Sequence, residues 1–185
     1  MSITLFLDTE FTGLRQQATL ISLALVSDDH RSFYAEFTDY DTEQVNEWVK
    51  AQVIDNLILD GINQTEGSNW HVKGNHLEIS RALRKFLAQF NHSTNHEVQI
   101  WADCLAYDWV LFCELFGGAM HLPESIFYMP FDLVTLLKIN NINPDISREE
   151  FVQESLENIP TKQAKHNALW DAHVLKLCYE KAMNR

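Results

Sequence analysis

The hydrophobic and polar positions near the start of the chain predict three β-strands in succession. Residues 3–8 form a short, almost continuous apolar run, which is typical of a central strand. Two more β-rich runs follow at 19–27 (TLISLALVS) and 32–38 (SFYAEFT), and the polar SDDH between them indicates a turn. We expect these three strands to pair in antiparallel fashion.

Beyond residue 40 the pattern alternates between helical and strand-like segments. Residues 77–90 have apolar side chains at helical spacing, and residues 105–116 predict a helix that ends at Gly117 and Gly118. The other predicted elements are helices at 42–54, 131–139 and 167–183, a strand at 98–102 and irregular structure at 55–76. Strands followed by alternating helices and strands predict an α/β fold with a mixed sheet of about five strands. We expect one domain over residues 1–185.

Composition and charge narrow the classes of protein that fit. The 185 residues are 46% hydrophobic, which suits a domain with a substantial core, and the formal net charge is −12. Proteins that coat long duplexes usually carry the opposite sign, so any contact with nucleic acid is expected to be local. Three cysteines without a CxxC pair favour a reducing compartment. With neither a signal peptide nor an apolar run of membrane-spanning length, a cytoplasmic protein without membrane contact is expected.

Two carboxylates on the first strand carry the chemical signal. Asp8 and Glu10 lie two residues apart and point to the same side of a strand, with no basic residue before Arg15. Buried like charges need neutralising, and Mg²⁺ or Mn²⁺ prefers carboxylate oxygens. Further acids are therefore expected at the ends of other core elements. Asp108, early in a predicted helix, and Asp171, in the last helix, fit this expectation.

A histidine near Asp171 completes the candidate set. His166 precedes Asp171 by five residues, and on one continuous helix such residues diverge by roughly 140°. The two side chains share a site more easily if His166 lies in the loop before the helix. Asn167 is a plausible N-cap for that arrangement.

In this order, the motifs resemble those of the DEDDh exonucleases of the ribonuclease-H-like superfamily. The first motif is DTEFTGL, with Asp8 and Glu10; the second is Tyr107-Asp108; the third is HNALWD, from His166 to Asp171. These motifs look most like those of a small bacterial and phage group of 3′–5′ exoribonucleases typified by a mycobacterial enzyme. The resemblance implies a ribonuclease-H-like mixed sheet flanked by helices.

The resemblance also implies a mechanism and a substrate. Two Mg²⁺ or Mn²⁺ ions would be held by Asp8, Glu10, Asp108 and Asp171, and His166 would be the general base. The substrate would be the 3′ end of single-stranded RNA or a 3′ overhang, with RNA favoured over DNA, and the products nucleoside 5′-monophosphates. The predicted substrate contacts are Thr9, Phe11, Thr12, Gly13, Leu14 and Tyr107, with Leu14 as a wedge between terminal bases. A homodimer is a further hypothesis, because small relatives often pair.

One departure and two alternatives remain at this stage. Many relatives carry Asn four residues before the second-motif Asp, where this chain has Cys104. Asp103 is a rival carboxylate just upstream, but Tyr107-Asp108 and the apolar helix after it match the motif better, which leaves Asp103 an indirect role or a substrate contact. The alternatives are an exodeoxyribonuclease of the proofreading or repair type, and a catalytically silent module that binds nucleic acid or protein. The presence of all five site residues weighs against the silent module.

Overall fold

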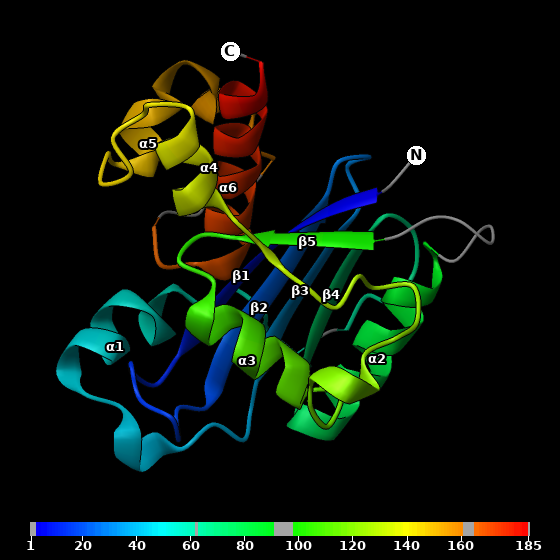
Figure 1. The fold of residues 1–185 in the computed structure, drawn as a ribbon. Helices are drawn as coiled ribbons and strands as arrows, with labels where there is room; N and C mark the ends of the chain where they lie inside the picture. The colour runs from blue at the N-terminus through cyan, green and yellow to red at the C-terminus, as the bar shows by residue number, and fades with distance from the viewer. Residues whose placement is uncertain (1–2, 62, 91–97, 161–164, 185) are drawn as a thin grey trace.

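A mixed β-sheet forms the centre of the protein in the computed structural model, which describes residues 3–61, 63–90, 98–160 and 165–184 (Figure 1). Within those residues the sheet has six strands in the order β4-β3-β2-β1-β5-β6. The strands are β1 (Ile3–Phe11), β2 (Leu20–Ser27), β3 (Ser32–Phe37), β4 (Asn69–Gly74), β5 (Val98–Ala102) and β6 (Phe131–Asp132). The predicted α/β class and mixed sheet are confirmed, with one strand more than the expected five.

The pairing of the strands follows from the lengths of their connections. β1 pairs with β2 and β2 with β3 in antiparallel fashion, as predicted; a loop at 12–19 joins the first pair and a turn at 28–31 the second. β4 adds to β3, β5 to β1 and β6 to β5 in parallel fashion, after longer connections. β1 is therefore central and hydrogen-bonded on both sides, which explains its nearly continuous apolar sequence.

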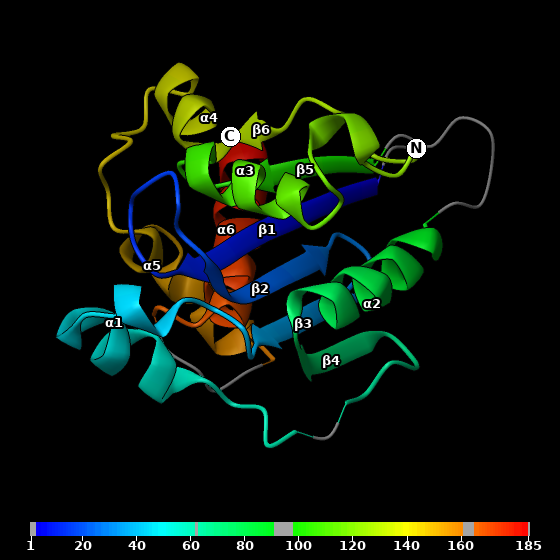
Figure 2. The same ribbon diagram turned by 90° about the horizontal axis from the view of Figure 1, so that it is seen from below.

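Helices cover both faces of the sheet. α2 (His76–Ala88) and α3 (Ala106–Glu114) lie on one face, and α6 (Ala168–Met183) crosses the other together with α4 (Leu133–Ile139) (Figures 1 and 2). Two short helices, α1 (Glu47–Gln52) and α5 (Arg148–Phe151), complete the α-helices of the described residues. The 3₁₀ segments are Thr42–Gln44, Ile54–Asn56, Ala119–His121 and Gln153–Asn158. The predicted helices at 77–90, 105–116 and 167–183 thus form α2, α3 and α6, within two residues at each end.

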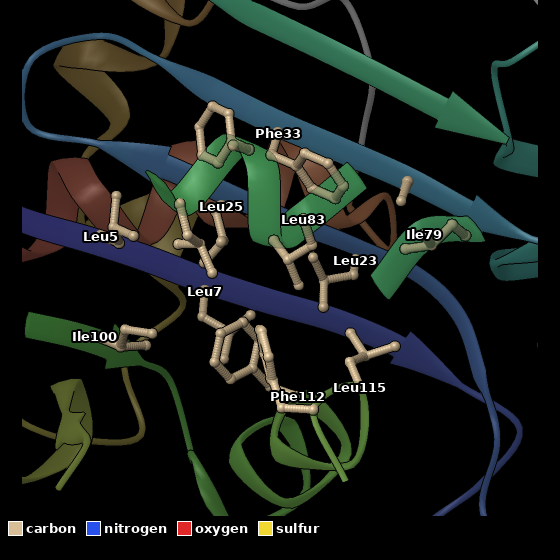
Figure 3. Close-up of a cluster of buried hydrophobic side chains, with 14 of the residues drawn as sticks. Leu5, Leu7, Leu23, Leu25, Phe33, Ile79, Leu83, Ile100, Phe112 and Leu115 are labelled. Carbon is tan, nitrogen blue, oxygen red and sulfur yellow. The ribbon is translucent and has the colours of Figure 1, made fainter. Parts of the chain in front are cut away.

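Alternation along β1 divides its side chains between the two layers. Leu5 and Leu7 pack against side chains of α2 and α3, in the core drawn in Figure 3. Phe6 points the other way and packs against α4 and α6. Because the side-chain period of a strand is two residues, Asp8 and Glu10 follow Phe6 onto the α6 face.

Three expectations about individual elements were wrong. Residues 69–74, expected to be irregular, form β4. Its buried residues Trp70, Val72 and Gly74 alternate with the polar residues Asn69, His71 and Lys73, which are exposed or half-buried as in an edge strand. The helix expected over 42–54 is broken into short pieces, because the Asn46 side chain accepts the Val49 N–H and starts a new helix. The helix expected at 131–139 begins only at Leu133, after the two residues of β6.

Candidate active site

The first two acids of the site lie at the carboxyl end of β1. The register between β1 and β2 shifts between Glu10 and Phe11, which marks a β-bulge directly after the Asp8–Glu10 pair. Asp8 Oδ2 is buried and has no hydrogen-bond partner among the described residues. A buried carboxylate oxygen without a partner is costly, so this atom indicates a group that the protein itself does not supply.

Asp108 comes from the first turn of α3 and is fixed by Thr9 of β1. The Thr9 backbone N–H donates to Asp108 Oδ1 at 2.9 Å, and the Thr9 hydroxyl donates to the same oxygen at 2.7 Å. Asp108 is almost fully buried, and these two hydrogen bonds favour its charged form. Thr9 therefore positions a carboxylate, and its contact with substrate stays a prediction.

Asp171 and His166 are joined by the start of α6. Asn167 is the N-cap of α6, as predicted, and its side chain accepts the Trp170 N–H. His166 lies before the helix with a left-handed backbone (φ 66°), and its N–H donates to Asp171 Oδ2 at 2.8 Å. Histidine tolerates this conformation better than most residues. The backbone turn thus brings both members of the third motif to one place.

Crowding raises the pKa of every acid in this group. Burial, followed by the charges of Asp171 and Asp108, raises the pKa of Asp8 well above its usual range and that of Glu10 to about 8. Burial raises the pKa of Asp108 to about 6 against the opposing hydrogen bonds from Thr9, and that of Asp171 to about 7. Without a cation, Glu10 therefore keeps its proton at neutral pH, Asp171 is near its midpoint and Asp108 is mostly charged.

The same electrostatics act on His166 in the opposite direction. Burial and the nearby charge of Lys165 lower the pKa of the imidazole, against the opposing charge of Glu149. The ring of Trp48, on α1, meets the His166 ring edge-on with 5.0 Å between centroids. His166 is therefore neutral at neutral pH, as a proton acceptor must be.

Asp8, Glu10, Asp171 and His166 line a cavity of about 250 Å³, whereas Asp108 is buried behind it against Thr9. Glu10, His166 and Asp171 each offer a ligand atom, and these atoms lie within 4.8 Å of one another. Oxygen donors from several acids, with an unpartnered oxygen of Asp8 among them, match the preferences of a hard divalent cation. The residues present therefore fit the predicted metal, and Asp8, Glu10, Asp108 and Asp171 could hold it.

The predicted substrate contacts divide into interior and exposed groups. Thr12 is fully buried, and its hydroxyl donates to Gln44 and accepts the Thr19 N–H, so it holds the loop after β1 together. Phe11 and Tyr107 stack on each other with ring centroids 5.6 Å apart. Leu14 is 76% exposed and free to meet a ligand.

Gly13, between Thr12 and Leu14, has a positive φ of 157°. A side chain there would come within 3.3 Å of the Arg15 guanidinium.

Sequence reasoning missed two neighbours of the site. Trp48 carries no motif signal, and only the fold brings it to His166. Asp103 was recognised as a nearby acid, but its partner Arg148 was not: the two form an ion pair with a shortest N–O distance of 2.6 Å. Their separation of 45 residues leaves no local pattern to read.

Comparison with known proteins decides the assignment. A family model described as the 3′–5′ exoribonuclease Rv2179c-like domain matches residues 3–183. The chain belongs to this family. The resemblance to DEDDh exonucleases of the mycobacterial type is thereby confirmed.

Two curated proteins match this chain with the same identity and the same coverage. The protein named 3′–5′ exoribonuclease Rv2179c, from Mycobacterium tuberculosis strain ATCC 25618 / H37Rv, is 30% identical over 121 residues. The 3′–5′ exoribonuclease MT2234.1 of strain CDC 1551 / Oshkosh matches equally. The alignment covers 65% of this chain and 66% of each relative, so it spans just under two thirds of the relatives' length.

Solved structures share the fold of this Rv2179c-like domain. The nuclease domain of 3′hExo, described as a DEDDh family member bound to rAMP, matches with a TM-score of 0.62 over 99% of this chain and 92% of that chain. A 3′-exonuclease in a structure of histone mRNA stem-loop recognition matches with a TM-score of 0.65 over 99% and 64%. Each is 8% identical to this chain, which establishes a shared fold and confirms the predicted ribonuclease-H-like architecture.

No helix among the described residues is long and apolar enough to cross a membrane.

Proposed function

We propose that this Rv2179c-like domain is a divalent-metal-dependent 3′–5′ exoribonuclease. It would hydrolyse single-stranded RNA, or 3′ overhangs, to nucleoside 5′-monophosphates. The observation that carries the proposal is the convergence of four acids around the unpartnered Asp8 Oδ2, beside a neutral histidine. The names of the family and of its curated mycobacterial relatives support the choice of RNA.

The proposed ions are Mg²⁺ or Mn²⁺, two in each site, held by Asp8, Glu10, Asp108 and Asp171. Bound divalent cations supply Lewis-acid stabilisation of the negative charge that develops on a phosphate during phosphodiester hydrolysis. The carboxylates must lose their protons to bind, and a nearby cation favours that charged form.

His166 is the proposed general base. Its imidazole lies in the wall of the same cavity as Asp8, Glu10 and Asp171. One ring nitrogen would accept a proton from the attacking water, because the lowered pKa keeps the ring neutral. The Trp48 ring packs against the imidazole at a steep angle, with 5.0 Å between ring centroids.

The 3′-terminal bases would be held by the loop after β1. Leu14 is exposed to solvent near the start of this loop, where its side chain would insert between two bases. An unpartnered apolar side chain of this kind suits an unstacked strand end better than a continuous duplex. Phe11 and Tyr107, already stacked on each other, would border the bound strand.

Matched RNA and DNA oligomers test the proposal. Each is labelled at the 5′ end and incubated with Mg²⁺, Mn²⁺ or EDTA, and a circular single-stranded RNA is included. The expected result is a ladder of shortening RNA with Mg²⁺ or Mn²⁺ only, an intact circle, and no cleavage by Asp8→Asn. Cleavage in EDTA, cleavage of the circle, or full activity of folded Asp8→Asn contradicts the proposal, and faster cleavage of DNA contradicts its choice of RNA.

We also propose a homodimer and a cytoplasmic location. The described residues include three free cysteines, two of them buried, which suits a reducing compartment. Light scattering during full activity tests the dimer, and a monomer would remove it. Fractionation of cells expressing the native chain tests the location.

A further inference from the structure

A fifth carboxylate lies beside the four acids. Asp103 directly follows β5, whose last residues pair in parallel with β1 at Phe6 and Trp101. Asp8 lies two residues after Phe6, and Asp103 lies two residues after Trp101. Both acids are therefore at the same end of the sheet. Asp103 lines the same cavity as Asp8, and its side chain is 26% exposed.

Asp103 differs from the other four acids because it forms an ion pair with the side chain of Arg148. Arg148 Nε donates to Asp103 Oδ2 at 2.6 Å, and Arg148 Nη2 donates to Asp103 Oδ1 at 3.0 Å. Both carboxylate oxygens are thus occupied by one planar guanidinium. Such two-pronged pairs fix direction as well as distance.

Arg148 is itself anchored to the protein. Its Nη1 donates to the carbonyl oxygens of Pro144 at 3.0 Å and Ile146 at 2.6 Å. Its own carbonyl accepts the Cys178 thiol of α6. A guanidinium has five N–H donors, and that of Arg148 donates four hydrogen bonds to other groups of the protein. The side chain is therefore built to hold Asp103, with little left to bind a phosphate.

We propose that Arg148 is a positioning residue that withholds Asp103 from the ion-binding carboxylates. This inference rests on the proposed metal-dependent function. Released from Arg148, Asp103 would offer a fifth carboxylate to an ion in the cavity. The ion would then bind more tightly, with a set of carboxylate ligands that differs from the proposed catalytic set.

A set of four proteins tests this assignment: wild type, Arg148→Met, Asp103→Asn and the double variant. Calorimetry without RNA gives the Mn²⁺ affinity, and RNA hydrolysis gives kcat and KM. Changes to groups that orient metal ligands typically alter affinity or activity by about 10- to 100-fold. We expect Arg148→Met to bind Mn²⁺ about tenfold more tightly and to lose about tenfold in kcat. Asp103→Asn alone should bind Mn²⁺ more weakly, since an unpaired Arg148 then repels the ion.

The decisive result is the double variant. If Arg148 acts by withholding Asp103, removing both should return kcat and Mn²⁺ affinity to within about threefold of wild type. If adding Asp103→Asn to Arg148→Met does not restore kcat, the inference is overturned. It is also overturned if Arg148→Met changes only the KM for RNA.

Folding is controlled by a second substitution and by melting temperature. Arg148→Lys keeps the charge but loses the two-pronged geometry, so it should give a smaller effect that Asp103→Asn also reverses. If Arg148→Lys lowers the melting temperature but leaves the Mn²⁺ affinity unchanged, Arg148 has a purely structural role and the inference is overturned. Absence of Mn²⁺ binding by the wild type would overturn the proposed function, and this inference with it; normal binding with failed rescue overturns this inference alone.

Discussion

Replacing Glu10 with glutamine should stabilise the metal-free protein at pH 8. In the folded protein the pKa of Glu10 is raised from 4.5 to about 8, by burial and by the charges of Asp171 and Asp108. The folded protein therefore keeps a proton that the unfolded chain releases between these values. Stability from this group is complete below pH 4.5 and is lost as the pH rises towards 8.

The magnitude follows from the width of that window. At about 1.36 kcal/mol per pH unit, a gap of about 3.5 units corresponds to at most about 5 kcal/mol of unfolding free energy. The neighbouring acids share this cost, because protonation of one relieves the others. We therefore expect Glu10→Gln to gain about 1–3 kcal/mol at pH 8, or about 3 °C in melting temperature for each kcal/mol.

Urea unfolding in EDTA at pH 5.5 and pH 8 measures the effect. Glu66→Gln, at an exposed position away from the site, controls for the general loss of one negative charge. Saturating Mn²⁺ should restore wild-type stability at pH 8, by about 2.7 kcal/mol at 100 times Kd, and should act less on Glu10→Gln. A wild type equally stable at both pH values, with no gain in Glu10→Gln over its control, would refute the reasoning.

Three further outcomes are expected around the proposed base and its neighbours. His166→Ala should lower kcat by about 10²- to 10⁴-fold with Mn²⁺ affinity largely kept, and a large loss of Mn²⁺ binding would make His166 a ligand instead. Lys165→Met should raise the pKa of both His166 and Asp171, so the acid limb of the pH–rate profile should move to higher pH. An unmoved limb would show that the charge of Lys165 does not set the pKa values that control the rate. Thr9→Val removes a donor from Asp108 and should raise its pKa above about 6, which weakens Mn²⁺ binding at pH 6 but not at pH 8.

Local patterns made much of this architecture predictable. β1 to β3 follow from apolar runs and a polar turn, and the shared face of Asp8 and Glu10 follows from the period of a strand. The placement of His166 before α6 could be inferred because an Asn167 N-cap is a local signal.

Non-local contacts were out of reach of the sequence. Thr9 and Asp108 meet across 99 residues, and nothing in either motif marks Thr9 as the group that fixes the acid. The hold of Arg148 on Asp103 depends on where α5 packs against α6. β4 escaped prediction because an edge strand keeps polar side chains on its outward positions.

The order of the site residues along the chain bears on how activity appears during synthesis. The hairpins β1 to β3 are local and can fold early, but β5 and Asp108 must be made before β1 gains its parallel neighbour. α6, whose Lys176 donates to the Ser27 carbonyl from 149 residues away, is synthesised after these elements and carries Asp171. A nascent chain on the ribosome thus holds Asp8 and Glu10 long before the remaining acids. A site of the proposed kind therefore stays incomplete beside the message that encodes it until residue 171 has been synthesised.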